Sequence, residues 1–176
     1  MTGKGSLNHN SRKFHAKNTD PNRTHWNVEY CNEDIKDVYH ELFDEALKRY
    51  NDKQTRKDRK IDDYYEKIRS GKQEKLFHEV ILQIGDKDNM GSETMEGQLA
   101  AKILDEYMKG FQERNPTLRV FAAHLHLDEA TPHLHIDFIP YVTGSKRGLD
   151  TRVSLKQALS SLGFKGGSRS ETELNQ

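Results

Sequence analysis

Four histidines lie within twelve residues, as two His-x-His pairs: His124 and His126, then His133 and His135. Alternate side chains of a strand point to the same face, so each pair shares one face while the intervening leucines take the other. The five residues DEATP, which join the two expected strands, suit a hairpin. If the leucine rows are buried together, the imidazoles converge, and neutral imidazoles at that density favour a metal ion.

A chance row of histidines on a solvent-facing strand is the alternative, but the density and strict alternation argue against it. Which three bind stays open: His126, His133 and His135 lie nearest the turn, and His124 lies one step further away. Three histidines without a fourth protein ligand leave positions for substrate or water, as in catalytic sites. Asp128 and Glu129 in the turn could bind the metal, orient a ligand or act as a general base.

The elements that must position these side chains follow from hydrophobic periodicity. Alternating or β-branched segments predict strands, and apolar residues at helical spacing predict helices. We expect strands at about 24–30, 76–84, 118–127 and 133–142, and helices at about 32–50, 54–71, 92–113 and 154–163. The order predicts an α+β fold with a central antiparallel β-sheet flanked by amphipathic helices.

Three of the expected helices have recognisable ends or faces. Asn32 is the expected N-cap of the helix at 32–50. Ser154 is the expected N-cap of the helix at 154–163, and Gly163 is expected to end that helix. The helix from Ser92 carries one apolar row, formed by Met95, Leu99, Ile103, Tyr107 and Phe111.

Composition limits the remaining possibilities. The 176 residues are 33% hydrophobic and 32% charged, with a mean hydropathy of −0.98, which indicates one modest core. No apolar run approaches the roughly 20 residues that span a bilayer, so we expect no membrane contact from this segment. The single cysteine, Cys31, excludes an internal disulfide and a zinc-finger cage, and a reducing cytoplasm is the default.

Charge is balanced only as a total. The 28 basic and 28 acidic residues cancel, yet the net charge is +4 over residues 1–27 and +3 over residues 144–176. The first segment is the N-terminus, and the second follows the histidine hairpin directly. Segregated charge permits a nucleic-acid groove on one side and predicts binding that depends on salt.

The histidine segment HLHLDEATPHLH resembles the histidine motif of plasmid mobilisation relaxases of the Mob/Pre (MobV) family, within the HUH endonuclease class. HNSRKFHAKNTDPNRTHWN resembles the same family's first motif. RGLDTRVSLKQALSSLGF and ETELNQ resemble the end of its relaxase domain. The resemblance therefore extends over nearly the whole chain.

This resemblance implies a five-stranded antiparallel sheet related to the RRM-like palm of HUH enzymes. It implies that His126, His133 and His135 hold a divalent cation, Mn²⁺ or Mg²⁺. It places His9 at the family's histidine nucleophile, Arg12 beside it as a catalytic basic residue, and Glu129 near the reacting phosphate. Residues 1–165 would form the catalytic domain, and 166–176 a flexible tail leading to an absent C-terminal region through which two copies would pair.

The implied activity is metal-dependent, site- and strand-specific nicking and strand transfer of DNA at a plasmid or mobile-element origin of transfer. His9 would form a covalent 5′-phosphoryl-histidine intermediate. The partner would be single-stranded or hairpin origin DNA in a bacterial cytoplasm, in plasmid mobilisation, conjugation and DNA recombination. Candidate DNA contacts are the basic residues near the two motifs: Arg12, Lys13, Lys17, Arg23, Lys146, Arg147 and Arg152.

Other functions are compatible with the same residues. Tyr64 and Tyr65 are rival nucleophiles, because many HUH endonucleases attack with tyrosines on a helix; the other interpretation is that they supply core surface to a charged helix. A replication initiator without catalysis is a further alternative. A histidine-metal hydrolase or oxygenase acting on a small molecule would need an enclosed apolar pocket, for which the chain has little hydrophobic material.

Overall fold

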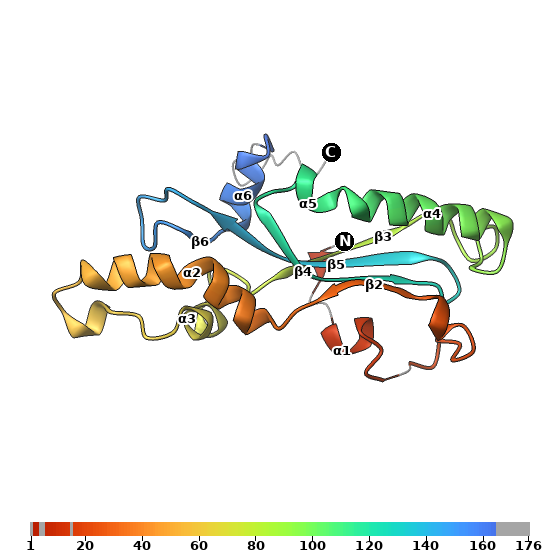
Figure 1. The fold of residues 1–176 in the computed structure, drawn as a ribbon, viewed down its shortest axis with the longest axis horizontal. Coiled ribbons are helices and arrows are strands. Elements are labelled where there is room, and N and C mark those ends of the chain that lie inside the picture. Colours follow the sequence, from red (N-terminus) through yellow and green to blue (C-terminus); the bar gives the residue numbers. More distant parts are fainter. Residues whose placement is uncertain (1, 4–5, 15, 165–176) are drawn as a thin grey trace. The chain divides into compact units, whose positions relative to one another are not determined.

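The computed structural model describes residues 2–3, 6–14 and 16–164, and it is an α+β fold built on an antiparallel sheet (Figure 1). The strand order is β1-β3-β5-β4-β2, and β6 pairs with β5. The strands are β1 (Thr2–Gly3), β2 (Val28–Asn32), β3 (His78–Gln83), β4 (Leu118–His126), β5 (His133–Val142) and β6 (Arg152–Val153). This confirms the predicted fold class.

Six α-helices and two 3₁₀ turns complete the described part of the chain. The helices are α1 (Leu7–Asn10), α2 (Ile35–Asp52), α3 (Tyr64–Ser70), α4 (Met95–Lys109), α5 (Phe111–Arg114) and α6 (Leu155–Ser161). The 3₁₀ turns are η1 (Thr24–Trp26) and η2 (Lys57–Arg59). No helix in these ranges is long and apolar enough to cross a membrane.

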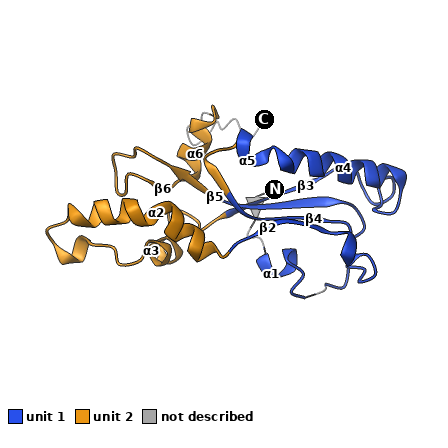
Figure 2. Cartoon of the chain, viewed as in Figure 1, with its two compact units in different colours: residues 1–33, 78–114, 120–138 blue, residues 34–77, 115–119, 139–176 orange. Residues whose placement is uncertain are grey.

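The chain divides into two compact units that interleave in sequence (Figure 2). Unit 1 contains residues 1–33, 78–114 and 120–138, and unit 2 contains residues 34–77, 115–119 and 139–176. The histidine hairpin and the first motif both belong to unit 1. The predicted tail, 166–176, and the segment ETELNQ lie outside the described residues.

In unit 1 the predicted hairpin forms, and its alternation separates two environments. Leu125, Leu134 and Ile136 are fully buried on one face, while the histidines occupy the alternate positions. Helix α4 lies along one side of the sheet and α1 on the other (Figure 1). The histidine face is the α1 side, because His126 bonds to Asn10.

The apolar row expected to anchor α4 is not the buried one. Met95 is 86% exposed, and Leu99, Ile103 and Tyr107 are also exposed, whereas Phe111 is buried. The buried row is the neighbouring one, one or two positions further along the chain, and is formed by Gly97, Ala100, Ala101, Leu104 and Met108. Gly97 lies against the loop that precedes the helix, where a Cβ would collide with the carbonyl oxygen of Gly91.

Several predicted boundaries are wrong for local reasons. The segment 24–30 is the turn η1 followed by β2, because the side chain of Asn27 accepts from the backbone N–H groups of Leu127 and Asp128. Helix α2 is capped by Asp34 rather than Asn32, and the helix expected from Ser92 begins at Met95, with Thr94 as its cap. The helix expected over 54–71 is reduced to η2 and α3.

Unit 2 has an aromatic core. The ring of Phe43 packs 5.2 Å from that of Tyr39 and 5.0 Å from that of Tyr64, measured between centroids, and all three residues are buried. Ser154 caps α6 as predicted, and Gly163 follows it with φ of 96°, a left-handed conformation that favours glycine. The aromatic rings thus anchor α2 and α3 to each other, and the cap and the glycine set the ends of α6.

Candidate active site

Three of the four clustered histidines converge on one point of unit 1. His126, His133 and His135 each offer a ligand atom, and these atoms all lie within 4.8 Å of one another. All three residues are buried. The predicted three-histidine cluster therefore forms.

Each of these imidazoles has one nitrogen fixed by an acceptor. His126 Nε2 donates to the carbonyl oxygen of Asn10 at 2.8 Å, and His133 Nδ1 to that of Thr131 at 2.9 Å. His135 Nδ1 donates to Glu79 Oε1 at 2.7 Å. Since the acceptors hold no proton to give, the other nitrogen of each ring keeps its lone pair, as metal ligands require.

The burial of the cluster favours neutral rings. Desolvation lowers the pKa of His126 to about 2, and burial also lowers the pKa of His133. His126 Nδ1 and His135 Nε2 are buried without a hydrogen-bond partner in the described residues. Unsatisfied buried nitrogens are costly, so this donor set fits a divalent cation.

His124 does not join the cluster. Its Nε2 lies 3.1 Å from Glu29 Oε2 on the neighbouring strand β2, where Glu29 pairs with it in the sheet. Burial lowers the pKa of His124, and the Glu29 carboxylate opposes that shift. The carboxylate contact gives this histidine a structural partner of its own.

Helix α1 brings His9 to the histidine cluster. Ser6 caps this helix, and the ring of His9 lies 6.1 Å from that of His126 and 6.5 Å from that of His135, between centroids. His9 Nε2 is 3.4 Å from Glu129 Oε1 and 3.3 Å from Arg12 Nη1. Residues from opposite ends of the chain thus meet in one place.

Arg12 connects α1 to the turn of the hairpin. Its guanidinium donates to both carboxylate oxygens of Asp128 and to Glu129 Oε1, the last at 2.9 Å. Burial opposes ionisation of Asp128, but these bonds lower its pKa to about 2. Arg12 has φ of 52° and is the one non-glycine residue with positive φ in the described ranges, a strained conformation typical of functional sites.

The same turn is held from two further directions. Asn18 Nδ2 donates to Glu129 Oε2 at 2.6 Å, and Ser92 Oγ donates to the carbonyl oxygen of Glu129 at 3.0 Å. The backbone N–H of Ser92 also donates to the carbonyl oxygen of Ala130. Both oxygens of the Glu129 side chain therefore have fixed partners, and Oε1 is the one that lies beside His9.

A hollow of about 280 Å³ opens at this place. Its lining combines the first motif, the turn and two of the clustered histidines: His9, Asn18, Ile81, Gln83, Glu129, Ala130, Thr131, His133 and His135. A group that enters it meets the imidazole of His9 and two ligand candidates together. The predicted catalytic and metal-ligating residues are thus all in unit 1 and in mutual contact.

Sequence reasoning missed two residues of the site, Asn10 and Glu79. Glu79 is a carboxylate within the apolar strand segment LFHEVILQIG, and a charged residue in a buried strand is a signal of function or of a specific partner. Asp137, on the histidine face of β5, is also buried; desolvation and the nearby Glu79 raise its pKa to about 7. Asn10 belongs to the quoted HNSR motif but carried no predicted role.

The candidate DNA contacts differ in how available they are. Lys13 and Lys17 are exposed, and Arg23 is held by Asp20 and by the carbonyl oxygen of Leu127. In unit 2, Arg147 and Arg152 line a hollow of about 700 Å³ together with Lys67 and Lys72. Lys146 is exposed beside them in the sequence.

The rival tyrosines serve the core of unit 2. Tyr64 is buried against Phe43, its hydroxyl accepts from the backbone N–H of Val153 at 3.1 Å, and burial raises its pKa. Tyr65 packs edge-on against Tyr39, with ring centroids 5.3 Å apart. These contacts favour the structural interpretation of both.

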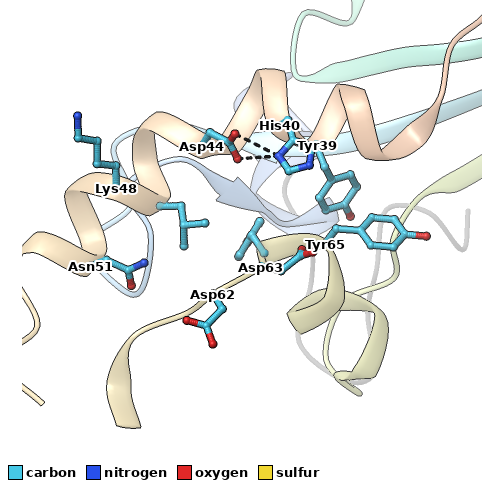
Figure 3. Close-up of a pocket in the computed structure, with 10 residues that line it drawn as sticks. Tyr39, His40, Asp44, Lys48, Asn51, Asp62, Asp63 and Tyr65 are labelled. Atoms are coloured by element: carbon cyan, nitrogen blue, oxygen red, sulfur yellow. Dashed lines mark hydrogen bonds and ion pairs between the residues drawn. The ribbon is translucent and has the colours of Figure 1, made fainter. Parts of the chain in front are cut away.

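Another hollow of about 370 Å³ lies in unit 2 between α2 and the start of α3 (Figure 3). His40 Nδ1 contacts the carboxylate of Asp44 on the same helix, which raises the pKa of His40. Asp63 is occupied as the N-cap of α3. His40, Asp44 and Asp63 are thus held by structural partners, and no group of three potential metal ligands forms here in the described residues.

Comparison with known proteins agrees with this geometry. The family model of the plasmid recombination enzyme, Mob_Pre, matches residues 4–164. No curated protein matches the chain.

Solved structures of the MobM relaxase domain bound to plasmid pMV158 oriT DNA are similar to the chain. A Mn-bound crystal structure at pH 5.5 is 26% identical with a TM-score of 0.50, covering 94% of this chain and 70% of that chain. A second Mn-bound structure, at pH 4.6, is 22% identical with a TM-score of 0.43, covering 94% and 84%. The chain belongs to the Mob_Pre family of plasmid recombination enzymes and has the fold of a DNA relaxase.

Proposed function

We propose that this enzyme nicks one strand of origin-of-transfer DNA by attack of His9 on the scissile phosphate. A ring nitrogen of His9 forms the P–N bond, the P–O3′ bond breaks, and the O3′ oxygen takes up a proton that balances the one released from the ring. The products are a 5′-phosphoryl-histidine and a free 3′ hydroxyl. The P–N bond keeps the phosphoryl group activated for strand transfer.

The observation that carries this proposal is the shared hollow of His9, Glu129, His133 and His135. A scissile phosphate placed there meets the nucleophile together with the imidazoles of His133 and His135, two members of the converging cluster. A divalent cation, Mn²⁺ or Mg²⁺, held by His126, His133 and His135 would supply positive charge to the non-bridging oxygens. The related MobM structures are Mn-bound.

The chain's own residues prepare His9 for attack. Glu129 Oε1 lies beside His9 Nε2, where it can orient the ring and hold its proton. Arg12 fixes Glu129 through a hydrogen bond and balances its charge. Asp128, fully buried, holds Arg12 in turn.

Phosphates that flank the scissile one would be bound by exposed basic residues. Lys13 and Lys17 of unit 1 belong to the motif that contains His9, while Arg12 and Arg23 are held by internal partners and would act mainly through position. In unit 2, Lys146, Arg147 and Arg152 would contact the backbone, the last two from a basic hollow. We expect the lysines of unit 1 and the basic residues of unit 2 to contribute to affinity and not to the chemical step.

The alternatives have weaker support. Tyr64 and Tyr65 are engaged in the aromatic core of unit 2. A small-molecule hydrolase or oxygenase would use an enclosed apolar pocket, and the hollow at the histidines is open and lined mostly by polar residues. A non-catalytic initiator would have no use for a histidine held against a metal-ligand cluster.

Cleavage of a supercoiled origin plasmid tests the proposal. His9→Ala should abolish nicking and the covalent adduct while keeping binding of the origin oligonucleotide, because the mutation removes only the nucleophile. Tyr64→Phe is the matched control, and should leave the adduct unchanged. An adduct of normal yield in His9→Ala, or one that mass spectrometry assigns to tyrosine, would refute the assignment.

Further details of the implied function stay predictions. These are the hairpin form of the DNA, pairing of two copies through a further C-terminal region, a bacterial cytoplasmic location and the domain boundary at residue 165.

A further inference from the structure

Asn10 directly follows His9 in α1 but points into the protein. Its side chain is almost completely buried, with 2% of the residue exposed, whereas Asn8 on the same helix is exposed. A buried amide must find partners for its two N–H groups and its oxygen. The partners of Asn10 include one metal-ligand candidate, His126, and a carboxylate that holds another, Glu79.

Three hydrogen bonds define its position. The backbone carbonyl oxygen of Asn10 accepts from His126 Nε2 at 2.8 Å. Its side-chain Nδ2 donates to Glu79 Oε1 at 2.9 Å and to Asp137 Oδ2 at 3.2 Å. Asn10 therefore contacts one metal-ligand candidate directly.

Glu79 extends the connection to a second ligand. The same oxygen, Oε1, that accepts from Asn10 also accepts from His135 Nδ1, at 2.7 Å. Glu79 is buried, and the His135 and Asn10 bonds outweigh its desolvation and keep its pKa low. The rings of His126 and His135 are thus oriented through the residue beside the proposed nucleophile.

The amide is suited to this place by its charge as well as its shape. Two carboxylates, Glu79 and Asp137, face Asn10 Nδ2, and an amide supplies protons to both without adding charge. An aspartate of the same size would add a third carboxylate and could donate to neither when ionised.

Helix α1 depends on such contacts for its order. It has four residues, far fewer than an isolated helix needs in water. Its anchors inside the unit include the Asn10 bonds and the Arg12 pair with Asp128.

We propose that Asn10 is a positioning residue that couples the order of α1, and so the placement of His9, to metal binding by His126 and His135. This rests on the proposed function, in which His9 attacks and the histidines hold the cation. Coupling is reciprocal: if an ordered α1 orients the ligands, then metal binding orders α1.

The first test measures Mn²⁺ affinity by isothermal titration calorimetry, without DNA. Asn10→Asp and Asn10→Ala should weaken Mn²⁺ binding by about 10- to 100-fold, the usual effect of removing a residue that orients a ligand. Asn8→Asp makes the same charge change on the exposed side of α1 and should retain the wild-type affinity. Equal affinities in the Asn10 and Asn8 variants would overturn the proposal.

The second test measures hydrogen exchange of the α1 backbone amides with and without Mn²⁺. In the wild type, Mn²⁺ should slow exchange at His9, Asn10 and Ser11. This gain in protection should be lost in Asn10→Ala. The amides of β4 and β5 should keep their protection in the same variant, which would show that the sheet remains folded. An undiminished gain in that variant would contradict the coupling.

Two further outcomes are informative. If the Asn10 variants lose protection in β4 and β5, the Glu79→Gln variant, which keeps the size of the side chain, is tested in their place. It should bind Mn²⁺ more weakly and show a smaller Mn²⁺-dependent gain in protection at α1. Wild-type affinity and gain in Glu79→Gln would then refute the proposal. Absence of Mn²⁺ binding to the wild-type protein would refute the metal site itself, and so the proposed function.

Discussion

The two units bury different kinds of side chain. Of the buried polar and charged residues in the described ranges, Ser154 alone belongs to unit 2; the others, from Asn10 to Asp137, lie in unit 1. Unit 2 instead buries aromatic rings around Phe43. Buried polar groups cost free energy unless they are paired. The paired polar groups of unit 1 therefore indicate a pre-arranged site, whereas the apolar packing of unit 2 serves stability.

The largest expected effect is on metal binding in unit 1. His133→Ala removes one of three ligands and should abolish measurable Mn²⁺ binding by calorimetry, together with nicking. His124→Ala, which removes a neighbouring histidine bound to Glu29, is the control and should retain Mn²⁺ binding. Equal losses in both variants would mean that the cluster includes His124.

Removal of an aromatic ring tests the core of unit 2. Phe43 is fully buried, so Phe43→Ala should lower the free energy of unfolding by about 3–5 kcal/mol, measured by chemical denaturation. The control Met95→Ala, at a position that is 86% exposed, should change it by less than about 0.5 kcal/mol. A small effect of Phe43→Ala would show that the aromatic cluster is not the main source of stability in unit 2.

Each unit contains one arginine–aspartate pair that is joined by two hydrogen bonds. The pair in unit 1 is buried, and the pair in unit 2 is exposed. Asp128→Asn in unit 1 removes a buried charge that holds Arg12, and should cost about 3 kcal/mol of unfolding free energy. Asp150→Asn in unit 2 breaks the exposed pair with Arg49 and should leave stability unchanged within error, because water screens that pair. Equal costs would contradict the distinction between the units.

The smallest effect concerns a feature that the units share. Thr94 caps α4 in unit 1 and Ser154 caps α6 in unit 2, each through a hydroxyl that accepts a backbone N–H. Replacement of either by alanine should cost about 1 kcal/mol in thermal or chemical unfolding. A much larger cost at one site would reveal a role there beyond capping.

The sequence predicted those parts of the structure that depend on local periodicity. The strict alternation of His and Leu in HLHL and HLHI determines which side chains share a face, because a strand has a period of two. The strands β3, β4 and β5 were predictable from their alternating or apolar sequences. The cap of α6 was predictable because serine is a preferred N-cap residue. Helix α1 was not, because four residues have no periodicity to detect and are ordered by tertiary contacts.

The tertiary structure decided which of the aligned residues meet. Both His124 and His126 lie on β4, but strand pairing places Glu29 beside His124, so only His126 joins His133 and His135. On α4, Ala100 and Leu104 are buried while Met95 and Leu99 are exposed, a choice between two rows that packing against the rest of unit 1 makes. Asn10 and Glu79 are 69 residues apart, and their bond exists only once the sheet has formed. The sequence by itself thus determined the ligand types and their faces, whereas register and packing between distant segments determined the site.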